Sequence, residues 1–425
     1  MNVTPVVEEV KTSKMLTVCC DVSKDTIEVY SRFGEEGHRF ELEETLENRT
    51  RAIEAGLKRY MELAGQHGYA SVCVVCEPTG GYERKLLGVA RRRGCQTAYV
   101  SGEAVNKARV IESNDTGKSD KKDPRIMQTL ASMGKTLEVR LLPGAYAELR
   151  ELNRQYEDES NTIVTIRNRM HDVLKNLFPD LDVAGDFLFS ATGRAIQKHY
   201  GFNPIRIFGQ PWPNVLATIR KEVRSGSIKK AELVWKAAQA SVLHLISNGE
   251  RELLDARLKE LFDDYDTHQG RKQRLREQML EVYSRTEEAG KLVGIADVSQ
   301  FQVARLIAET GPLRDFRDYR QLQRFLGLNL RQRQSGKYQG QDKISKKGRA
   351  LGRKVLYQMV FDSLIGERKL YGEYYRRKKE KSGSGTRAIV CVMRKALKMI
   401  MGVFRSARAF DARRVFTSME KKEAA

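Results

Sequence analysis

Four carboxylates are the residues of this sequence whose types and spacing could do chemistry. Asp21 ends the apolar run KMLTVCCD and Glu77 ends the run SVCVVCE, and both runs are typical of strands buried on two faces. If these strands are parallel neighbours, both carboxylates emerge at one edge of a sheet. Asp120 and Asp123 lie three residues apart at the start of an expected helix, and so on one face of its first turn. The sequence therefore predicts a cluster of four acids.

Four close carboxylates repel each other unless a divalent cation lies among them, and hard oxygen ligands select Mg²⁺, with Mn²⁺ possible. Two such ions about 4 Å apart would stabilise the attacking and the leaving oxygen of a phosphoryl displacement. A purely structural role is the alternative: Asp120 could cap a helix, and Asp21 could begin a turn with Ser23. The shared edge favours the metal site.

A serine is the second candidate. Ser335 precedes Gly336 in the basic stretch RQRQSGKYQGQDKISKKGRALGR, where an ordinary turn is the simpler interpretation. A serine hydroxyl attacks a phosphate only when a base or a metal activates it, and no histidine lies within sixty residues. The acidic cluster is the only evident activator. The cations expected to neutralise a bound phosphate are Arg331, Arg333, Lys337, Lys343, Lys346 and Lys347.

The charge of the chain favours a polyanionic partner. The net charge is +21, and residues 291–425 carry 32 Lys and Arg against 12 Asp and Glu. Nucleic acid should therefore bind most strongly to the last third. A membrane surface would attract the same charge, but no amphipathic helix with a Trp or Phe face accompanies it.

The compartment is expected to be cytoplasmic, with association to the nucleoid when DNA is bound. The sequence has no run of about 18 apolar residues, and residues 1–14 do not form a basic start followed by an apolar run. Five of the six cysteines lie in apolar, strand-like runs and are expected to be core residues of a protein in a reducing compartment.

The elements that must position these residues begin with three strands. A helix over residues 44–64, a second buried strand, a helix over 81–93 and a third buried strand follow. This β-β-β-α-β-α-β-α order predicts an RNase H-like (RuvC-like) mixed sheet with helices, so the fold class is α/β plus α.

Two apolar seams with spacing of three and four run over residues 149–177 and 254–282. They predict a coiled-coil middle, in which the two seams pair with each other or with a second copy. His268 and Lys272 lie at seam positions and could set its register. The C-terminal part is expected to be mostly helical, with a helix-hairpin-helix-like segment at KLVGIADVSQFQVARLIAETG, whose turn amides can meet a DNA phosphate.

The expected division of the chain has four parts. They are an RNase H-like domain (1–144), a coiled-coil and linker region (145–290), a basic, mostly helical domain that contains Ser335 (291–416) and a disordered tail (417–425).

Three motifs together resemble a known family. They are CCDVSKDTIEV near the start, CEPTGGYERKL with KSDKKDPRIMQTLA, and LVGIADVSQFQVARLIAETGPLRDF followed by LGLNLRQRQSGKYQGQDKISKKGRALGRKVL. Their order and spacing resemble the insertion-sequence transposases that carry a DEDD tetrad and a C-terminal serine domain and are guided by a bridge RNA. The chain departs from the usual family pattern at Pro124 and at Val293-Gly294-Ile295-Ala296. The second departure weakens the expectation of a helix-hairpin-helix.

The resemblance implies the site and the partners. The tetrad would be Asp21, Glu77, Asp120 and Asp123, and Ser335 the nucleophile that is held covalently on DNA while strands are exchanged. The expected partners are double-stranded donor and target DNA, a non-coding bridge RNA, and further copies of the chain in a dimer that assembles to a tetramer. The chain would then be an RNA-guided DNA recombinase.

Two other functions stay open. A metal-dependent nuclease of Holliday-junction-resolving type would use the same tetrad with water as nucleophile, and would not need Ser335. A non-catalytic nucleic-acid-binding scaffold would use neither. The seams also suggest a rod that separates the two catalytic domains by about 40 Å. From this we expect the tetrad of one chain to activate the serine of another.

Overall fold

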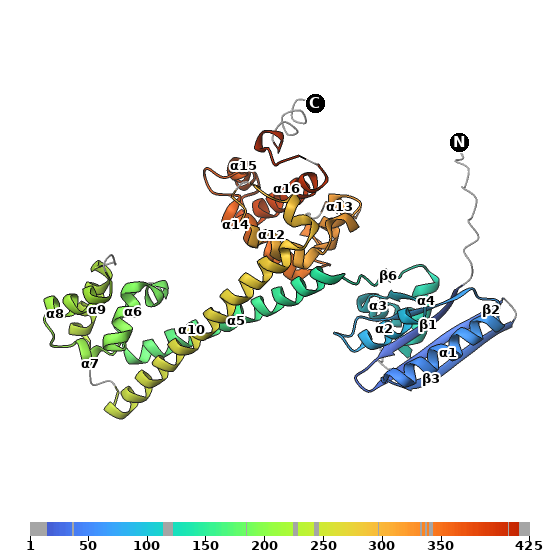
Figure 1. The fold of residues 1–425 in the computed structure, drawn as a ribbon, viewed down its shortest axis with the longest axis horizontal. Helices are drawn as coiled ribbons and strands as arrows, with labels where there is room; N and C mark the ends of the chain where they lie inside the picture. Colours follow the sequence, from blue (N-terminus) through green and yellow to red (C-terminus); the bar gives the residue numbers. More distant parts are fainter. Residues whose placement is uncertain are drawn as a thin grey trace. The chain divides into compact units, whose positions relative to one another are not determined.

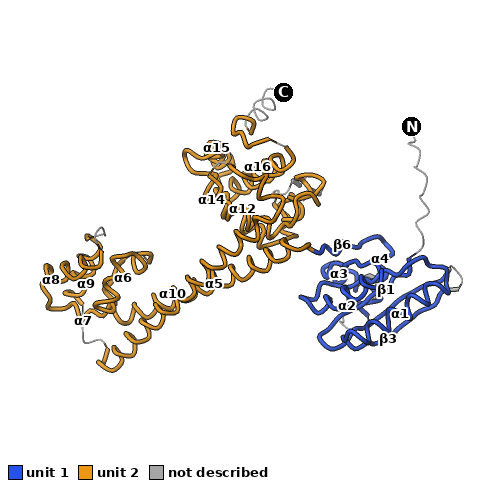
Figure 2. Tube along the Cα trace, in the orientation of Figure 1, with its two compact units in different colours: residues 1–141 blue, residues 142–425 orange. Residues whose placement is uncertain are grey.

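The fold is described from a computed structural model (Figure 1). It describes residues 15–415 apart from 36–37, 114–121, 184, 224–227, 242–245, 296, 332–333, 336–337, 340–342 and 407. The chain divides into two compact units, residues 1–141 and 142–425 (Figure 2). The second unit includes both segments that were expected to be the coiled-coil region and the serine domain. The expected tail over 417–425 lies outside the described residues.

The first unit is built on one mixed sheet. Its strands are β1 (Met15–Val22), β2 (Thr26–Glu35), β3 (His38–Glu47), β4 (Ser71–Cys76), β5 (Gln96–Tyr99) and β6 (Leu137–Glu138), in the spatial order β3-β2-β1-β4-β5-β6. β1, β4 and β5 are parallel, while β2, β3 and β6 join antiparallel. The element order agrees with the prediction up to β5, a further helix and the strand β6 were not predicted, and the RNase H-like mixed sheet is confirmed.

Helices cover both faces of this sheet. The helices are α1 (Thr50–Gln66), α2 (Glu83–Arg92), α3 (Gly102–Ser113) and α4 (Lys122–Ser132). One core joins α1 and α2 to the sheet face that carries Val18 and Val74. A second core joins α3 and α4 to the opposite face, through Cys19 and Val75. The central strands are therefore buried on both faces, which is why they are continuous apolar runs rather than alternating ones.

The first helix begins later than predicted. Residues 44–47 belong to β3, and α1 starts at Thr50. Leu46 matched the helical spacing by chance, since its side chain comes from the strand and packs over Gly56 of the helix. A Cβ on Gly56 would lie 2.8 Å from Leu46 Cδ1, so the glycine lets the strand and the helix approach closely.

Two long helices form the frame of the second unit. α5 (Gly144–Leu177) and α10 (Asn248–Ser284) lie side by side and antiparallel (Figure 1). The seams therefore pair within one chain. Their polar positions meet: His268 Nδ1 lies 2.5 Å from Glu159 Oε2, and the Lys272 ammonium lies 5.0 Å from the centre of the Tyr156 ring. These pairs fix the register of the two helices.

A small helical group closes one end of this frame. It contains α6 (Ala191–Tyr200), α7 (Pro204–Ile207), α8 (Trp212–Glu222), α9 (Ile228–Ala240) and the 3₁₀ turn Gly185–Phe189. Their apolar residues share one core with Ile163, Met170 and Leu258 of the long helices.

The serine-bearing part packs on the other end. It contains α11 (Glu287–Lys291), α12 (Gln300–Thr310), the 3₁₀ turn Leu313–Asp315, α13 (Tyr319–Phe325), α14 (Ala350–Ser363), α15 (Gly372–Ser382) and α16 (Gly385–Arg405). Its core includes Tyr146 and Leu149 at the start of α5 and Met279 near the end of α10. The C-terminal part is mostly helical, as predicted, but the segment 291–311 that was expected to be helix-hairpin-helix-like holds a single helix, α12, and the short α11 ends at its first residue.

This arrangement corrects one expectation. The paired seams carry the small helical group at one end and the serine-bearing part at the other, because α10 returns the chain to the beginning of α5. The rod expected to separate the RNase H-like and serine domains is therefore a different one, with both its ends inside the second unit.

Candidate active site

The first half of the candidate site lies at one edge of the sheet. β1 and β4 are parallel, and their last paired residues are Cys20 and Cys76. Asp21 and Glu77 follow these residues directly, so the two carboxylates leave adjacent strands at the same level, as predicted. Both residues are half-buried. A Cβ on Gly102, at the start of α3, would lie 2.9 Å from Glu77 Oε2, so the glycine leaves room for this carboxylate.

Asp123 meets an arginine that the sequence did not point to. The Arg109 Nε donates to Asp123 Oδ1 at 2.9 Å, and its Nη2 donates to Oδ2 at 2.7 Å. The Asp123 side chain is 5% exposed and that of Arg109 16%. Two parallel hydrogen bonds between buried charged groups are strong and geometrically specific. Both oxygens of Asp123 are therefore engaged within the protein.

The charges of Glu77 and Asp21 also act on the Arg109 guanidinium. The hydrogen bond to Asp123 raises the pKa of Arg109, and burial opposes this rise. The negative charges of Glu77 and Asp21 raise the pKa further. Arg109 thus lies where three of the four predicted acids act together, and its positive charge relieves their mutual repulsion.

The donor set fits a hard divalent cation in chemistry but only partly in geometry. Carboxylate oxygens are the ligands that such ions prefer. Within the part of the chain that the structure describes, no three Asp, Glu, His or Cys side chains come together as a metal-holding group. Asp120, the fourth predicted ligand, lies outside the described residues. The positive charge of Arg109 opposes the approach of a cation to the Asp123 oxygens, although each oxygen keeps a lone pair.

A second residue missed by sequence reasoning holds the loop after Glu77. The Glu83 Oε2 accepts hydrogen bonds from Thr79 Oγ1 at 2.8 Å and from Gly81 N at 2.9 Å, and its Oε1 accepts one from Tyr99 OH at 3.2 Å. Burial raises the pKa of Glu83, but the hydrogen bonds from Thr79, Gly81 and Tyr99 outweigh it and the pKa lies below its ordinary value. Its charged form therefore fixes the strand end that carries Glu77.

The second half of the candidate site is a β-hairpin arm in the other unit. At its base β7 (Leu330–Arg331) pairs with β10 (Lys343–Ile344), and farther out β8 (Gln334–Ser335) pairs with β9 (Tyr338–Gln339). Ser335 is paired with Tyr338 through the backbone, beside the turn of the arm. The side chains of residues 332–340, that of Ser335 included, lie outside the described part.

Two glycines allow the base of the arm to close. Gly327 has φ +70°, and a Cβ there would lie 2.9 Å from the backbone of Lys346. Gly348 has φ +148°, and a Cβ there would lie 2.3 Å from the Phe325 carbonyl oxygen. A side chain at either position would be strained and would collide with backbone. The glycines therefore set where the arm leaves the helical body.

Ser345 belongs to this base. Its Oγ donates to Asn329 Oδ1 at 2.6 Å, and its backbone N–H donates to the Asn329 carbonyl at 2.8 Å. These bonds join the two ends of the arm. Of the predicted cations, Arg331, Lys343, Lys346 and Lys347 are exposed around the base, while Arg333 and Lys337 lie outside the described residues.

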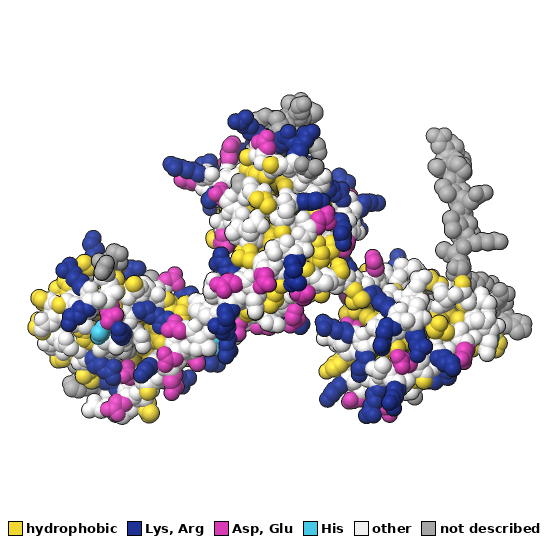
Figure 3. Space-filling model, in the orientation of Figure 1, with side chains coloured by type: hydrophobic (Ala, Val, Ile, Leu, Met, Phe, Trp, Pro, Cys, Tyr) yellow, Lys and Arg dark blue, Asp and Glu magenta, His cyan; other side chains and the backbone are white. Residues whose placement is uncertain are grey.

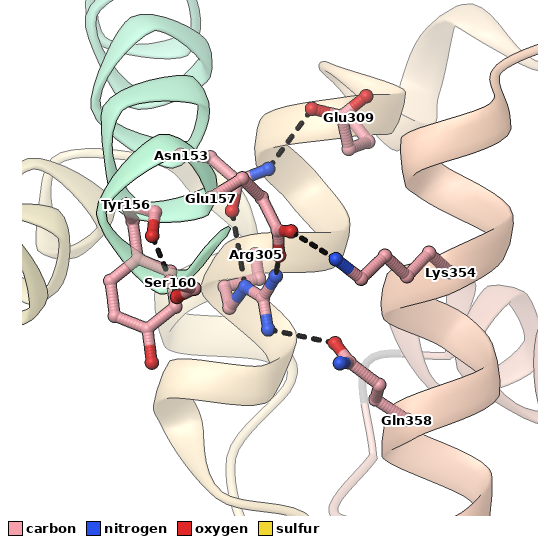
Figure 4. Close-up of polar contacts among 8 residues, drawn as sticks. All are labelled: Asn153, Tyr156, Glu157, Ser160, Arg305, Glu309, Lys354 and Gln358. Carbon is pink, nitrogen blue, oxygen red and sulfur yellow. Dashed lines mark hydrogen bonds and ion pairs between the residues drawn. The ribbon is translucent and has the colours of Figure 1, made fainter. Parts of the chain in front are cut away.

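A buried ionic network anchors the helix that follows the arm (Figure 4). Glu309 of α12 is 1% exposed and accepts from Arg349 Nη2 at 2.9 Å, next to the first residue of α14. The Asn153 amide of α5 donates to the other oxygen of Glu309 at 3.0 Å. The start of α14 is thereby tied to α12 and to the long helix α5.

One turn farther along, a second carboxylate repeats this connection. Glu157 of α5 accepts from Lys354 Nζ of α14 at 2.5 Å and from Arg305 of α12. The Arg305 Nη1 also donates to Gln358 Oε1 at 3.0 Å. Each buried acid of the network thus has a cationic partner, as burial of charge requires.

Family comparisons agree with both halves. A family model of IS110 transposases of the DEDD group, described as a transposase, matches residues 18–179. A model described as transposase of the IS116/IS110/IS902 family matches residues 291–376. Together the matches span more than half of the chain. The chain belongs to the IS110 family of transposases. The first match contains the acidic edge, and the second contains the hairpin arm of this transposase.

Comparisons with curated proteins and with solved structures do not refine this assignment. No curated protein matches this transposase. Among solved structures, Thermus thermophilus RuvC in complex with a Holliday junction is 12% identical, covers 30% of this chain and 100% of its own, and has a TM-score of 0.23. The Aquifex aeolicus Ppx/GppA phosphatase is 13% identical, covers 53% of this chain and 89% of its own, and has a TM-score of 0.19. With TM-scores this low, neither likeness bears on fold or function. Among the described helices, none is long and apolar enough to cross a membrane.

Proposed function

We propose that this transposase is an RNA-guided DNA recombinase that cuts and rejoins strands through a serine-DNA intermediate. The supporting observation is that the two family matches cover the two sets of candidate residues separately. The first match contains Asp21, Glu77 and Asp123 at the edge of the sheet, and the second contains Ser335 in the hairpin arm. Donor and target DNA are the substrates, and a non-coding bridge RNA selects them. The working form is a homo-oligomer.

The reaction conserves one phosphoester bond at each step. The Ser335 hydroxyl loses its proton and attacks a backbone phosphorus, and the bond from that phosphorus to one deoxyribose oxygen breaks. The leaving oxygen takes up a proton. A hydroxyl of another strand then attacks the phosphoserine, which restores a phosphodiester and frees Ser335. No ATP is needed, because each bond formed replaces an equivalent bond that was broken.

The acidic edge would hold a divalent cation, Mg²⁺ or Mn²⁺, on Asp21, Glu77, Asp120 and Asp123. When bound, such a cation lowers the pKa of an attacking hydroxyl and stabilises the leaving oxygen. The exposed cations at the base of the arm, such as Lys346 and Lys347, would neutralise neighbouring phosphates.

The test is to trap the covalent intermediate. The transposase, purified with its bound RNA, is incubated with DNA that carries both element ends, denatured, and searched by mass spectrometry for DNA joined to a serine. Wild type should give an adduct on Ser335, and Ser335→Ala should give none while binding DNA and RNA normally. Ser345→Ala is the matched control and should still form the adduct, because the backbone bond from Ser345 N–H to the Asn329 carbonyl keeps the base of the arm closed without the hydroxyl.

Two results would contradict the proposal. Cleavage without any adduct would indicate water as nucleophile and therefore a resolvase-type nuclease. An adduct that disappears only in Ser345→Ala would move the nucleophile to that residue. Sequencing the co-purified RNA tests guidance separately.

A further inference from the structure

A pocket on one face of α16 is lined by none of the residues of the candidate site. It has a volume of about 270 Å³ and opens to solvent. One wall is the α16 face of Lys395, Lys398, Met399, Gly402 and Val403, residues spaced three and four apart. The buried ring of Tyr371 and the segment with Phe410 and Arg414 supply the rest. The interior is therefore mainly apolar, and the lining carries three cations and one acid, Asp411, which pairs with Arg414 at 3.7 Å.

Gly402 is the residue that keeps this pocket open. It lies inside α16 in ordinary helical conformation, where glycine costs about 1 kcal/mol relative to alanine. Neither backbone conformation nor packing requires it, since a Cβ built there meets no atom within 4 Å. What the glycine provides is empty space beside Met399 and Val403.

The two lysines of the pocket wall, Lys395 and Lys398, each lie over a tyrosine ring outside the lining. The Lys395 ammonium lies 5.6 Å from the centre of the Tyr374 ring, and the Lys378 ammonium of α15 lies 5.5 Å from the same ring. The Lys398 ammonium lies 5.9 Å from the centre of the Tyr319 ring. Figure 3 shows Lys and Arg side chains gathered on the end of this unit that carries α15. Such a surface attracts phosphates, while a base would contact the apolar lining with Met399, Val403 and Phe410.

We propose that this pocket binds one unpaired nucleobase of a single strand, with the flanking phosphates on Lys395 and Lys398. A flat heterocycle suits an apolar slot of this size, and cations on the lining complement its phosphates. Bases in a duplex are stacked and paired, so duplex DNA cannot fill the pocket. The inference rests on the proposed function only in taking nucleic acid as the partner. The single strand is a loop of the RNA or a melted strand of the DNA.

The test fills the pocket in the full-length protein. Gly402→Leu places a good helix former where the structure leaves room, so the melting temperature should not fall. Its affinity for a short single-stranded RNA or DNA should fall about tenfold, as for loss of one stacked base. Its affinity for duplex DNA should stay unchanged. Gly88→Leu, an exposed helical glycine of α2 that also has open space, is the control and should change neither affinity.

The RNA and DNA probes distinguish the sources, since the natural strand should show the larger loss. If Gly402→Leu lowers the melting temperature, the pair Lys395→Gln with Lys398→Gln decides. The double variant should bind single strands more weakly, and the slope of log affinity against log salt concentration should fall by about one to two, the number of counterions no longer released.

Unchanged single-strand affinity in a folded Gly402→Leu protein overturns the proposal. An equal loss of affinity for duplex DNA in Gly402→Leu also overturns it. An altered oligomeric mass of this variant with normal nucleic-acid binding overturns it too, because the pocket would then bind a second copy of the chain. All binding is measured in a Ser335→Ala background. A transposase that forms no serine adduct can therefore still satisfy this inference, and the two can fail separately.

Discussion

Arg109 holds Asp123 through two hydrogen bonds that use both oxygens of the carboxylate, at 2.9 and 2.7 Å. A residue expected to bind a metal is thus occupied by a cation of the protein itself. Each Asp123 oxygen can accept a further partner, but the positive charge of Arg109 opposes a second cation there, so the Arg109 contact weakens metal binding at Asp123.

Replacing Arg109 by Gln should therefore strengthen metal binding. Loss of the competing charged hydrogen bonds should raise the affinity for Mn²⁺ by about tenfold or more. The metal-free protein should melt at a lower temperature, because the acids then repel each other without relief. Titration of Mn²⁺ by electron paramagnetic resonance and thermal unfolding in EDTA measure the two effects.

Lys107→Gln is the matched control, since Lys107 forms an exposed pair with Glu103 on the same helix. It should change neither quantity. A weaker Mn²⁺ affinity in Arg109→Gln would mean that Arg109 orients Asp123 for the metal rather than competing with it.

Acid should loosen the loop that follows Glu77. The pKa of Glu83 is lowered in the folded protein, so the stability that its charged form contributes is present above the ordinary glutamate pKa of about 4.3. It is lost as the pH falls through the lower folded value. The Thr79 and Gly81 amides donate to Glu83 Oε2 at 3.3 and 2.9 Å, and their protection factors against hydrogen exchange, corrected for the intrinsic rate at each pH, should fall in that window.

Glu83→Gln should show fast exchange of these two amides at neutral pH already, with little further acid dependence. Glu54→Gln, a half-buried acid on α1, serves as control. Amides that stay protected in Glu83→Gln would show that the charge does not hold the loop.

The network behind the serine arm should carry part of the stability of the second unit. Glu309→Gln removes the charge that faces Arg349 and should cost about 2 kcal/mol, less than a fully buried pair because Arg349 is partly exposed. Chemical unfolding measures this loss. Lys236→Gln breaks an exposed pair with Glu232 and should change the unfolding free energy by less than about 0.5 kcal/mol. Equal effects of the two substitutions would contradict a structural role for Glu309.

A shared active site remains a prediction that rests on the family resemblance. Ser335→Ala and Asp21→Asn proteins should each be inactive, and a mixed oligomer should regain partial recombination, because one intact acid set then meets one intact serine. Recombination by the mixture is measured alongside its mass. An inactive mixture with confirmed mixed oligomers would place each site within a single chain.

The sequence predicted the sheet well because its central strands are buried on both faces. Such strands are long apolar runs whose ends are easily located, and this placed Asp21 and Glu77 correctly. The boundary of α1 was wrong because Leu46 satisfies helical and extended patterns alike. Periodicity cannot separate the two where a strand runs directly into a helix.

The site was less predictable than the fold because partners from different elements complete it. Arg109 meets Asp123 only when α3 and α4 pack together, and Glu83 meets Tyr99 only through the parallel pairing of β4 and β5. Arg109 is one of many cationic residues in a basic chain, so its residue type alone does not mark it as part of the site. The pairing of Glu159 with His268 could be anticipated only as two polar breaks in two seams.

The return of α10 to the start of α5 has a consequence for synthesis of the protein. The core of the serine-bearing part takes Tyr146 and Leu149 from its beginning and Phe404 from near its end. A ribosome must therefore release almost the whole chain before this core can close, and until then the apolar faces of both long helices are uncovered. The sheet of the first unit uses only residues before 142. A messenger cut short within α16 would yield a chain with a complete acidic edge and an unfinished second unit, which chaperones and proteases would remove.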